Sequence, residues 1–225
     1  MSNDPRSEQA EPDRSWRKAV APFEAPSLRR SLGQIANSVL PYLALLVAMY
    51  FALELSYWLA LALAVPAAGF LVRIFIIFHD CGHGSFFRSG LANRVTGFWT
   101  GVLVFTPSRN WHRRHAQHHA TAGDLDRRGT GDVWTLTVRE YRALSRWGRL
   151  KYRVYRHPAV LFGVGPAYTF FVENRLWRSR DGRPERWSTV HTNLALAGHE
   201  RTLAARKLPA QFLSFGSRGT PSAQG

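Results

Sequence analysis

The sequence predicts an all-α integral membrane protein. The architecture expected is a transmembrane hairpin, a re-entrant or interfacial helix, and cytoplasmic helices that carry histidines. Two apolar segments, at 35–53 and 57–78, each approach the roughly 20 residues needed to cross a bilayer core. Histidines at helical spacing follow the second segment and recur at 112–119. Basic residues flank the apolar runs, which is typical of a chain held at a membrane.

Net charge narrows the class of partner. The 225 residues include 30 Lys and Arg against 15 Asp and Glu, a formal charge of +15. Such an excess suits nucleic acid or an anionic membrane surface. Because the cations border apolar segments and no nucleic-acid motif is present, we expect membrane lipids as partners and no nucleic acid. The single cysteine excludes an intramolecular disulfide framework.

The first 80 residues predict a tail and the hairpin. Residues 1–30 are polar and proline-rich, and they predict a disordered tail. By the positive-inside tendency, the arginines before position 35 hold this tail in the cytoplasm. Glu54 and Ser56 mark a tight turn between the spans, and Pro66 is expected to kink the second without breaking it. The hairpin then returns the chain to the cytoplasm, so both histidine clusters are expected there.

Later segments are less regular. The stretch 95–106 is too short to span easily and predicts the re-entrant or interfacial helix. The basic region 109–156 fits either attraction to anionic lipid or docking of an acidic electron carrier, and 133–150 predicts one helix within it. A short apolar run follows at 158–172. Residues 177–225 predict an atypical, disordered C-terminal tail.

Two histidine clusters carry the chemistry. Residues four apart share a helix face, so His79 and His83 point the same way. Spacings of three and four residues also place the histidines of the second cluster on nearly one face of another helix. This cluster consists of His112, His115, His118 and His119. Converging imidazoles predict a transition-metal site for iron, copper, zinc or nickel.

These residues carry a family resemblance. His79-Asp-Cys-Gly-His83 resembles the first histidine box of membrane fatty acid desaturases, and His115-Ala-Gln-His118-His119 resembles their second. The segments after the second box resemble the bacterial branch related to Δ12/ω-6 acyl-lipid desaturases. The resemblance implies a partial desaturase-like membrane domain at 35–176 that binds two irons and uses dioxygen to insert a double bond into an acyl chain. It also implies a fatty acyl substrate, lipid-bound or thioester, and an electron donor such as ferredoxin or cytochrome b5.

Carboxylates near the boxes are candidates for hydrogen bonding to the metal ligands. Asp80 adjoins the first ligand, and three more follow the second box, namely Asp124, Asp126 and Asp132. The alternative is that they are solvated loop carboxylates.

The sequence departs from the family after the second box. Only His191 and His199 follow (apart from His157), and neither forms the family's third His-x-x-His-His box. We therefore expect a C-terminally truncated or frame-shifted desaturase. Two other interpretations stay open: an alkane or carotenoid hydroxylase of the same histidine-box superfamily, and a non-catalytic metal-binding membrane remnant.

Overall fold

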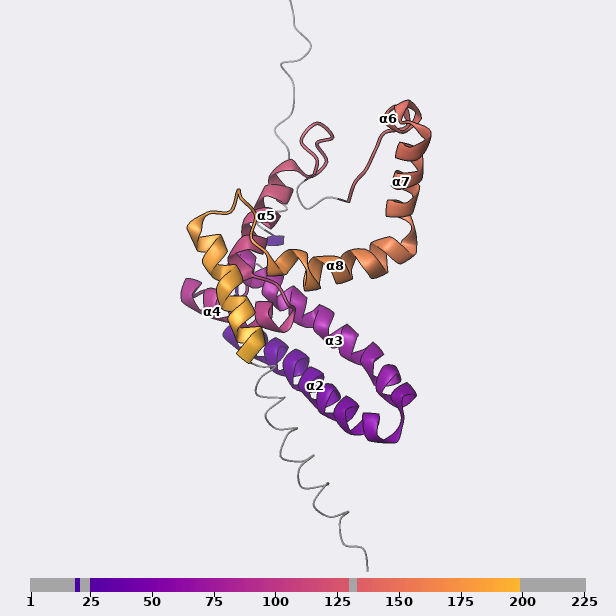
Figure 1. The fold of residues 1–225 in the computed structure, drawn as a ribbon. Coiled ribbons are helices and arrows are strands. Elements are labelled where there is room, and N and C mark those ends of the chain that lie inside the picture. Colours follow the sequence, from indigo (N-terminus) through magenta and orange to yellow (C-terminus); the bar gives the residue numbers. More distant parts are fainter. Residues whose placement is uncertain (1–18, 21–24, 130–132, 199–225) are drawn as a thin grey trace, which may run out of the picture.

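The computed structural model describes residues 19–20, 25–129 and 133–198, and within these ranges the regular structure is entirely helical. Figure 1 shows a long helical hairpin, α2 and α3, whose upper end meets α4 and α5, with α6 to α8 forming a separate arm. The predicted all-α class is confirmed. The predicted tail at 1–30 lies mostly outside the described residues, but Leu28–Arg30 already belong to α2.

The hairpin consists of α2 (Leu28–Leu55) and α3 (Tyr57–His83), joined at Ser56. Both helices are long and apolar enough to cross a membrane, and both extend beyond the predicted spans 35–53 and 57–78. The added ends contain polar residues, which a helix accepts outside the apolar run. Within the hairpin, the guanidinium of Arg73 donates to Asn37 and Ser38 on α2 and links the two helices. Most leucines of the hairpin face outward, as a lipid-facing surface requires.

The core lies under the last three turns of α3. Ile74 and Phe78 pack with Tyr42 of α2 and Val104, while Ile77 and Cys81 pack with the two phenylalanines of the loop 84–89. Asn93 is buried beneath that loop, where its side chain accepts from Phe87 N–H and donates to the carbonyls of Gly84 and Phe87. The C-terminal end of α3 is therefore the most firmly packed part of the hairpin.

Two 14-residue helices cross this end of α3. They are α4 (Gly90–Leu103), where the sequence predicts the short helix 95–106, and α5 (Ser108–Thr121). The turn between them holds Phe105 at φ 55°, a left-handed conformation that is uncommon for a bulky residue. Arg175 and Asn174 both donate to the Phe105 carbonyl, which fixes the turn and hence the start of α5.

The arm differs from the single helix predicted at 133–150. It contains α6 (Val138–Ala143) and α7 (Arg146–Arg156), because Leu144 is extended and the Ser145 side chain caps a new helix by accepting from Gly148 N–H. The apolar run 158–172 is a π-helical turn, η1 (Val160–Val164), followed by α8 (Gly165–Phe171) and a 3-10 turn, η2 (Glu173–Arg175). None of these five elements, all described in full, buries a residue.

The expectation of a tail without regular structure at 177–225 is wrong for residues 183–198, which are helical. This helix buries hydroxyl side chains, Ser188, Thr189 and Thr192, where an amphipathic helix would bury apolar ones. The usual apolar periodicity is consequently missing, and the sequence gives no sign of the helix. Residues 199–225 lie outside the described residues.

Candidate metal centre

Four histidines from two helices converge beside the end of α3. His79 and His83 lie one turn apart on α3, and His115 and His119 lie one turn apart on α5. Their possible ligand atoms all lie within 4.8 Å of one another. The Nε2 atom of His115 is 3.0 Å from that of His79, 3.2 Å from that of His83 and 2.9 Å from that of His119. Nitrogens that bind one metal ion at roughly 2 Å each come about this close to one another.

Hydrogen bonding fixes the first ligand. Nδ1 of His79 lies 3.0 Å from a carboxylate oxygen of Asp80. A donated Nδ1–H leaves the Nε2 lone pair directed at the cluster, which is the arrangement typical of metal-binding histidines. Asp80 therefore lies where the sequence analysis expects a carboxylate partner of the metal ligands.

Trp111 packs between His115, in the α5 pair, and the aromatic side chains of α3. The ring of Trp111 stacks on His115 with centroids 4.3 Å apart, and it also packs edge-on against Phe75 and tilted against Phe78 of α3. Burial and then the neighbouring imidazoles lower the pKa of His115 to about 4. This imidazole is consequently neutral at physiological pH, the state in which a histidine binds a metal.

The other two predicted histidines of α5 lie on either side of the four. His112 packs so tightly over Gly82 that a Cβ built there would be 2.3 Å from the imidazole Cδ2. It hydrogen-bonds to the Phe78 backbone, and burial lowers its pKa. Together with Gly82, His83, His115, Ala116 and His119 it lines a cavity of about 440 Å³. His118 borders a different cavity, of about 730 Å³, that Trp111 and Glu173 also line.

The remaining predicted carboxylates lie after α5. Asp124 accepts from the guanidinium and backbone of Arg127 and from the Asp126 N–H, and the Arg127 hydrogen bond is the main cause of its lowered pKa. These partners tie Asp124 to its own loop. Asp126 is exposed in the same loop, and Asp132 lies outside the described residues. Their role toward the ligands stays a prediction.

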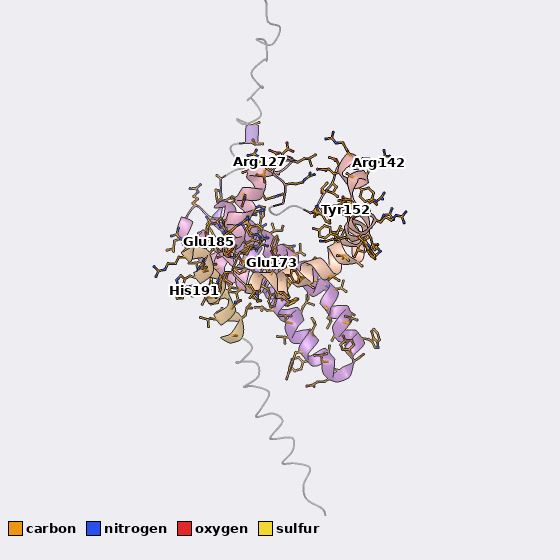
Figure 2. The ribbon with its side chains drawn as sticks, turned by 45° about the horizontal axis from the view of Figure 1, so that its top comes forward. Arg127, Arg142, Tyr152, Glu173, Glu185 and His191 are labelled. Atoms are coloured by element: carbon orange, nitrogen blue, oxygen red, sulfur yellow. The ribbon has the colours of Figure 1, made fainter. Side chains whose placement is uncertain are left out.

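Charged contacts that the sequence analysis missed hold α5 in place. Asp181, only 3% exposed, accepts from Arg113 at 2.5 Å, from Asn110 and from the Arg178 N–H. Glu185 pairs with Arg113 and Glu173 pairs with Arg114 at longer range, and Figure 2 labels both glutamates near the centre of the molecule. Some 68 residues separate Arg113 from Asp181, so no local pattern could reveal this contact. Trp111, by contrast, lies one helical turn before His115, and that spacing is visible in the sequence.

The donor set fits a metal ion. Four imidazole nitrogens without a nearby thiolate suit iron, copper, zinc or nickel and disfavour the hard cations magnesium and calcium. Because these histidines lie at the end of a helix able to cross a membrane, the candidate site is close to the bilayer.

Comparisons with known proteins point the same way. The family model for fatty acid desaturase matches residues 56–206, more than half of the chain and beyond the predicted limit at 176. A fatty acid desaturase of Bacillus subtilis is 50% identical over 179 residues, which cover 80% of this chain and 51% of the relative. No solved structure matches the chain.

Two further relatives are more distant. The sn-1 acyl-lipid omega-3 desaturase (ferredoxin) of Synechocystis is 30% identical over 63% of this chain and 39% of its own length. The acyl-lipid omega-3 desaturase (cytochrome b5) of the Arabidopsis thaliana endoplasmic reticulum is 31% identical over 56% and 32%. The chain thus spans about half, or less, of the length of these curated relatives.

The matched region contains α3 with both of its histidines and α5 with the other two, so the cluster of four histidines falls inside it. The hairpin and the matched family together make this a membrane protein. Because the family model matches more than half of its residues, the chain belongs to the fatty acid desaturase family.

Proposed function

We propose that this chain supplies the first two histidine boxes of an oxygen-dependent membrane desaturase, an oxidoreductase that inserts a double bond into a fatty acyl chain in lipid metabolism. The observation that carries the proposal is the convergence of four Nε2 atoms from α3 and α5 in a member of this family. The four histidines can bind the metal that such a reaction needs. The proposed reaction itself is inferred from the family.

The proposed ligands of one iron are His79, His83, His115 and His119. His112 and His118 line different cavities next to this group, and each is a candidate ligand of a second iron. Iron held by neutral imidazoles supplies the activation of dioxygen. The chain's own part is to hold the ligands: Asp80 keeps the proton of His79 on Nδ1, and Trp111 covers one face of His115.

Substrate and electron donor follow from the relatives. Two of them carry acyl-lipid in their names, and these names give ferredoxin and cytochrome b5. We infer a fatty acyl substrate, bound to a lipid or as a thioester, and an electron donor of one of these two kinds. The N-terminus and the histidines are inferred to face the cytoplasm, where such donors reach a membrane enzyme.

The test is oxidation of acyl chains by the chain itself. The protein would be reconstituted with iron in lipid nanodiscs, supplied with reduced ferredoxin and air, and the acyl chains analysed by mass spectrometry. Loss of two hydrogen atoms per chain is the expected result, and it should vanish in His83→Ala and persist in His157→Ala, a histidine far from the cluster along the chain.

Each other outcome identifies an alternative. A gain of one oxygen atom would make the protein a hydroxylase of the same histidine-box superfamily. Iron bound without any acyl product would leave a metal-binding remnant, and both results would contradict the proposal.

A further inference from the structure

The helix α7 carries an exposed apolar stripe on the arm, away from the histidines. Trp147 is 80% exposed, Leu150 48% and Val154 54%. At three and four residues apart, these side chains lie along one face of the helix. Phe162 and Val164 of η1, which follows α7 along the chain, are also exposed.

A neighbouring face of α7 is covered by the protein's own chain, which fixes the direction of the stripe. Tyr152 and Tyr155 pack edge-on against Trp134, and their hydroxyls accept from the backbone N–H groups of Leu136 and Trp134. Figure 2 shows Tyr152 within this arm, apart from Glu173 and Glu185 at the centre of the molecule. The segment 133–136 therefore occupies the tyrosine face and leaves the stripe facing outward.

The charge of α7 indicates an anionic partner. The helix contains no acidic residue and five basic ones, Arg146, Arg149, Lys151, Arg153 and Arg156. By helical spacing, Arg146 and Arg153 border one side of the stripe, Lys151 borders the other, and Arg156 lies opposite. Long basic side chains at the border of an apolar stripe can extend toward lipid phosphates while their stems cover apolar surface.

We propose that α7 lies in the interface of an anionic membrane, with Trp147, Leu150 and Val154 among the lipids and the bordering cations at the head groups. An apolar stripe with an aromatic residue at its end and cations along both borders is the pattern of an interfacial helix. Because α2 and α3 are able to hold the chain at a bilayer, a lipid surface is the partner closest at hand for α7. The proposal depends on the membrane location and not on the metal chemistry.

Fluorescent labels on opposite faces of α7 test this. In a Cys81→Ala background, Leu150→Cys and, as the matched control, Arg156→Cys would each be labelled with an environment-sensitive fluorophore in full chains reconstituted in phosphatidylglycerol nanodiscs. The label at 150 is expected to be quenched by lipids bearing a nitroxide near the head group. Aqueous iodide should quench it at least about threefold less than the label at 156.

Three results would overturn the proposal. Equal iodide quenching at 150 and 156, with none by nitroxide lipid, would place the stripe in water. Shielding that appears only when an acidic ferredoxin is added would make the stripe a protein-docking surface. Shielding from both quenchers without added protein would mean that another copy of the chain covers it.

A second comparison tests the charge. Replacing Arg146 and Lys151 together by Gln should weaken the lipid contact of the label at 150 by about tenfold or more in phosphatidylglycerol, because each cation near an anionic surface contributes to binding. Phosphatidylcholine nanodiscs should show no difference between the variant and the parent. An equal loss in both lipids would contradict the preference for anionic lipid.

Discussion

The two helices that share the metal cluster are held in different ways. The last turns of α3 bury Ile74, Ile77, Phe78 and Cys81, so His79 and His83 stand on the core of the protein. The helix α5, which the structure describes in full, buries none of its residues. Instead, Trp111 packs against α3 and the charged contacts of Arg113 and Arg114 hold its flank.

The two histidine pairs are therefore positioned by different interactions. Hydrophobic burial gives the α3 pair its position, and that position depends little on the rest of the chain. The α5 pair depends on partners at 173–185, which lie far away in the sequence. Changes at the cluster itself, at its hydrogen bonds and at the contacts of α5 should therefore have decreasing effects on metal binding.

Removing one ligand from each helix should have the largest effect. His83→Ala and His115→Ala are each expected to lower metal affinity by more than about 100-fold, which exceeds the loss typical of a change in a hydrogen-bonded neighbour. Metal content after dialysis and titration with Co²⁺ would measure it. His157→Ala, a histidine outside both clusters, is the matched control. An equal loss there would show that the metal is not held by these four histidines.

Asp80→Asn tests the hydrogen bond that orients the α3 pair. The amide keeps the shape but loses the charge that holds the proton on Nδ1 of His79. We expect metal affinity to fall by about 10–100-fold. Glu54→Gln, an exposed carboxylate at the far end of the hairpin, should leave the affinity unchanged. If both variants bind metal as the parent does, Asp80 is no partner of the ligands.

Asp181→Asn tests the long-range support of α5. The substitution removes the charge that Arg113 pairs with at 2.5 Å, and the Arg113 side chain is partly exposed, so water compensates in part. We expect a loss of about 1–3 kcal/mol in the free energy of unfolding. Thermal unfolding in detergent would measure it, and metal affinity should fall along with stability. Unchanged stability would mean that the contact does not hold α5.

Sequence reasoning reached the site because its signals are local. The spacing His79 to His83 and His115 to His119 defines helix faces, and those faces do meet. Spacing alone does not separate His112 and His118 from the other two histidines of α5, because their place in different cavities depends on how α5 crosses α3. Their role as ligands stays a prediction.

The hairpin followed equally well from its two apolar runs. The helix at 183–198 could not be predicted, because it buries hydroxyl side chains and shows no apolar periodicity. The contact of Asp181 with Arg113 could not be predicted either, because the two residues lie 68 positions apart in the sequence.

Gly82→Ala tests how closely the two helices must approach. A Cβ at this position would lie 2.3 Å from Cδ2 and 2.5 Å from Nε2 of His112, so α5 or the imidazole must move. Overpacking of this kind costs about 1–3 kcal/mol of stability. Gly33→Ala is the control, since nothing lies within 4 Å of its Cβ and alanine favours a helix. A Gly82→Ala variant as stable as the control would show that His112 does not pack here.

Protonation of His115 should lower the free energy of unfolding of the metal-free protein at acidic pH. This is the smallest of the five expected effects. Its pKa in the folded chain is about 4, below the value of about 6.5 for an unfolded chain. Between these values the unfolded chain binds more protons, so the free energy of unfolding decreases as pH falls from 6.5 toward 4. Melting temperatures of the metal-free protein at pH 7 and pH 5 should therefore differ more in the parent than in His115→Gln. An identical pH dependence in the two proteins would contradict the lowered pKa, and with it the enclosure of His115 by the other three imidazoles.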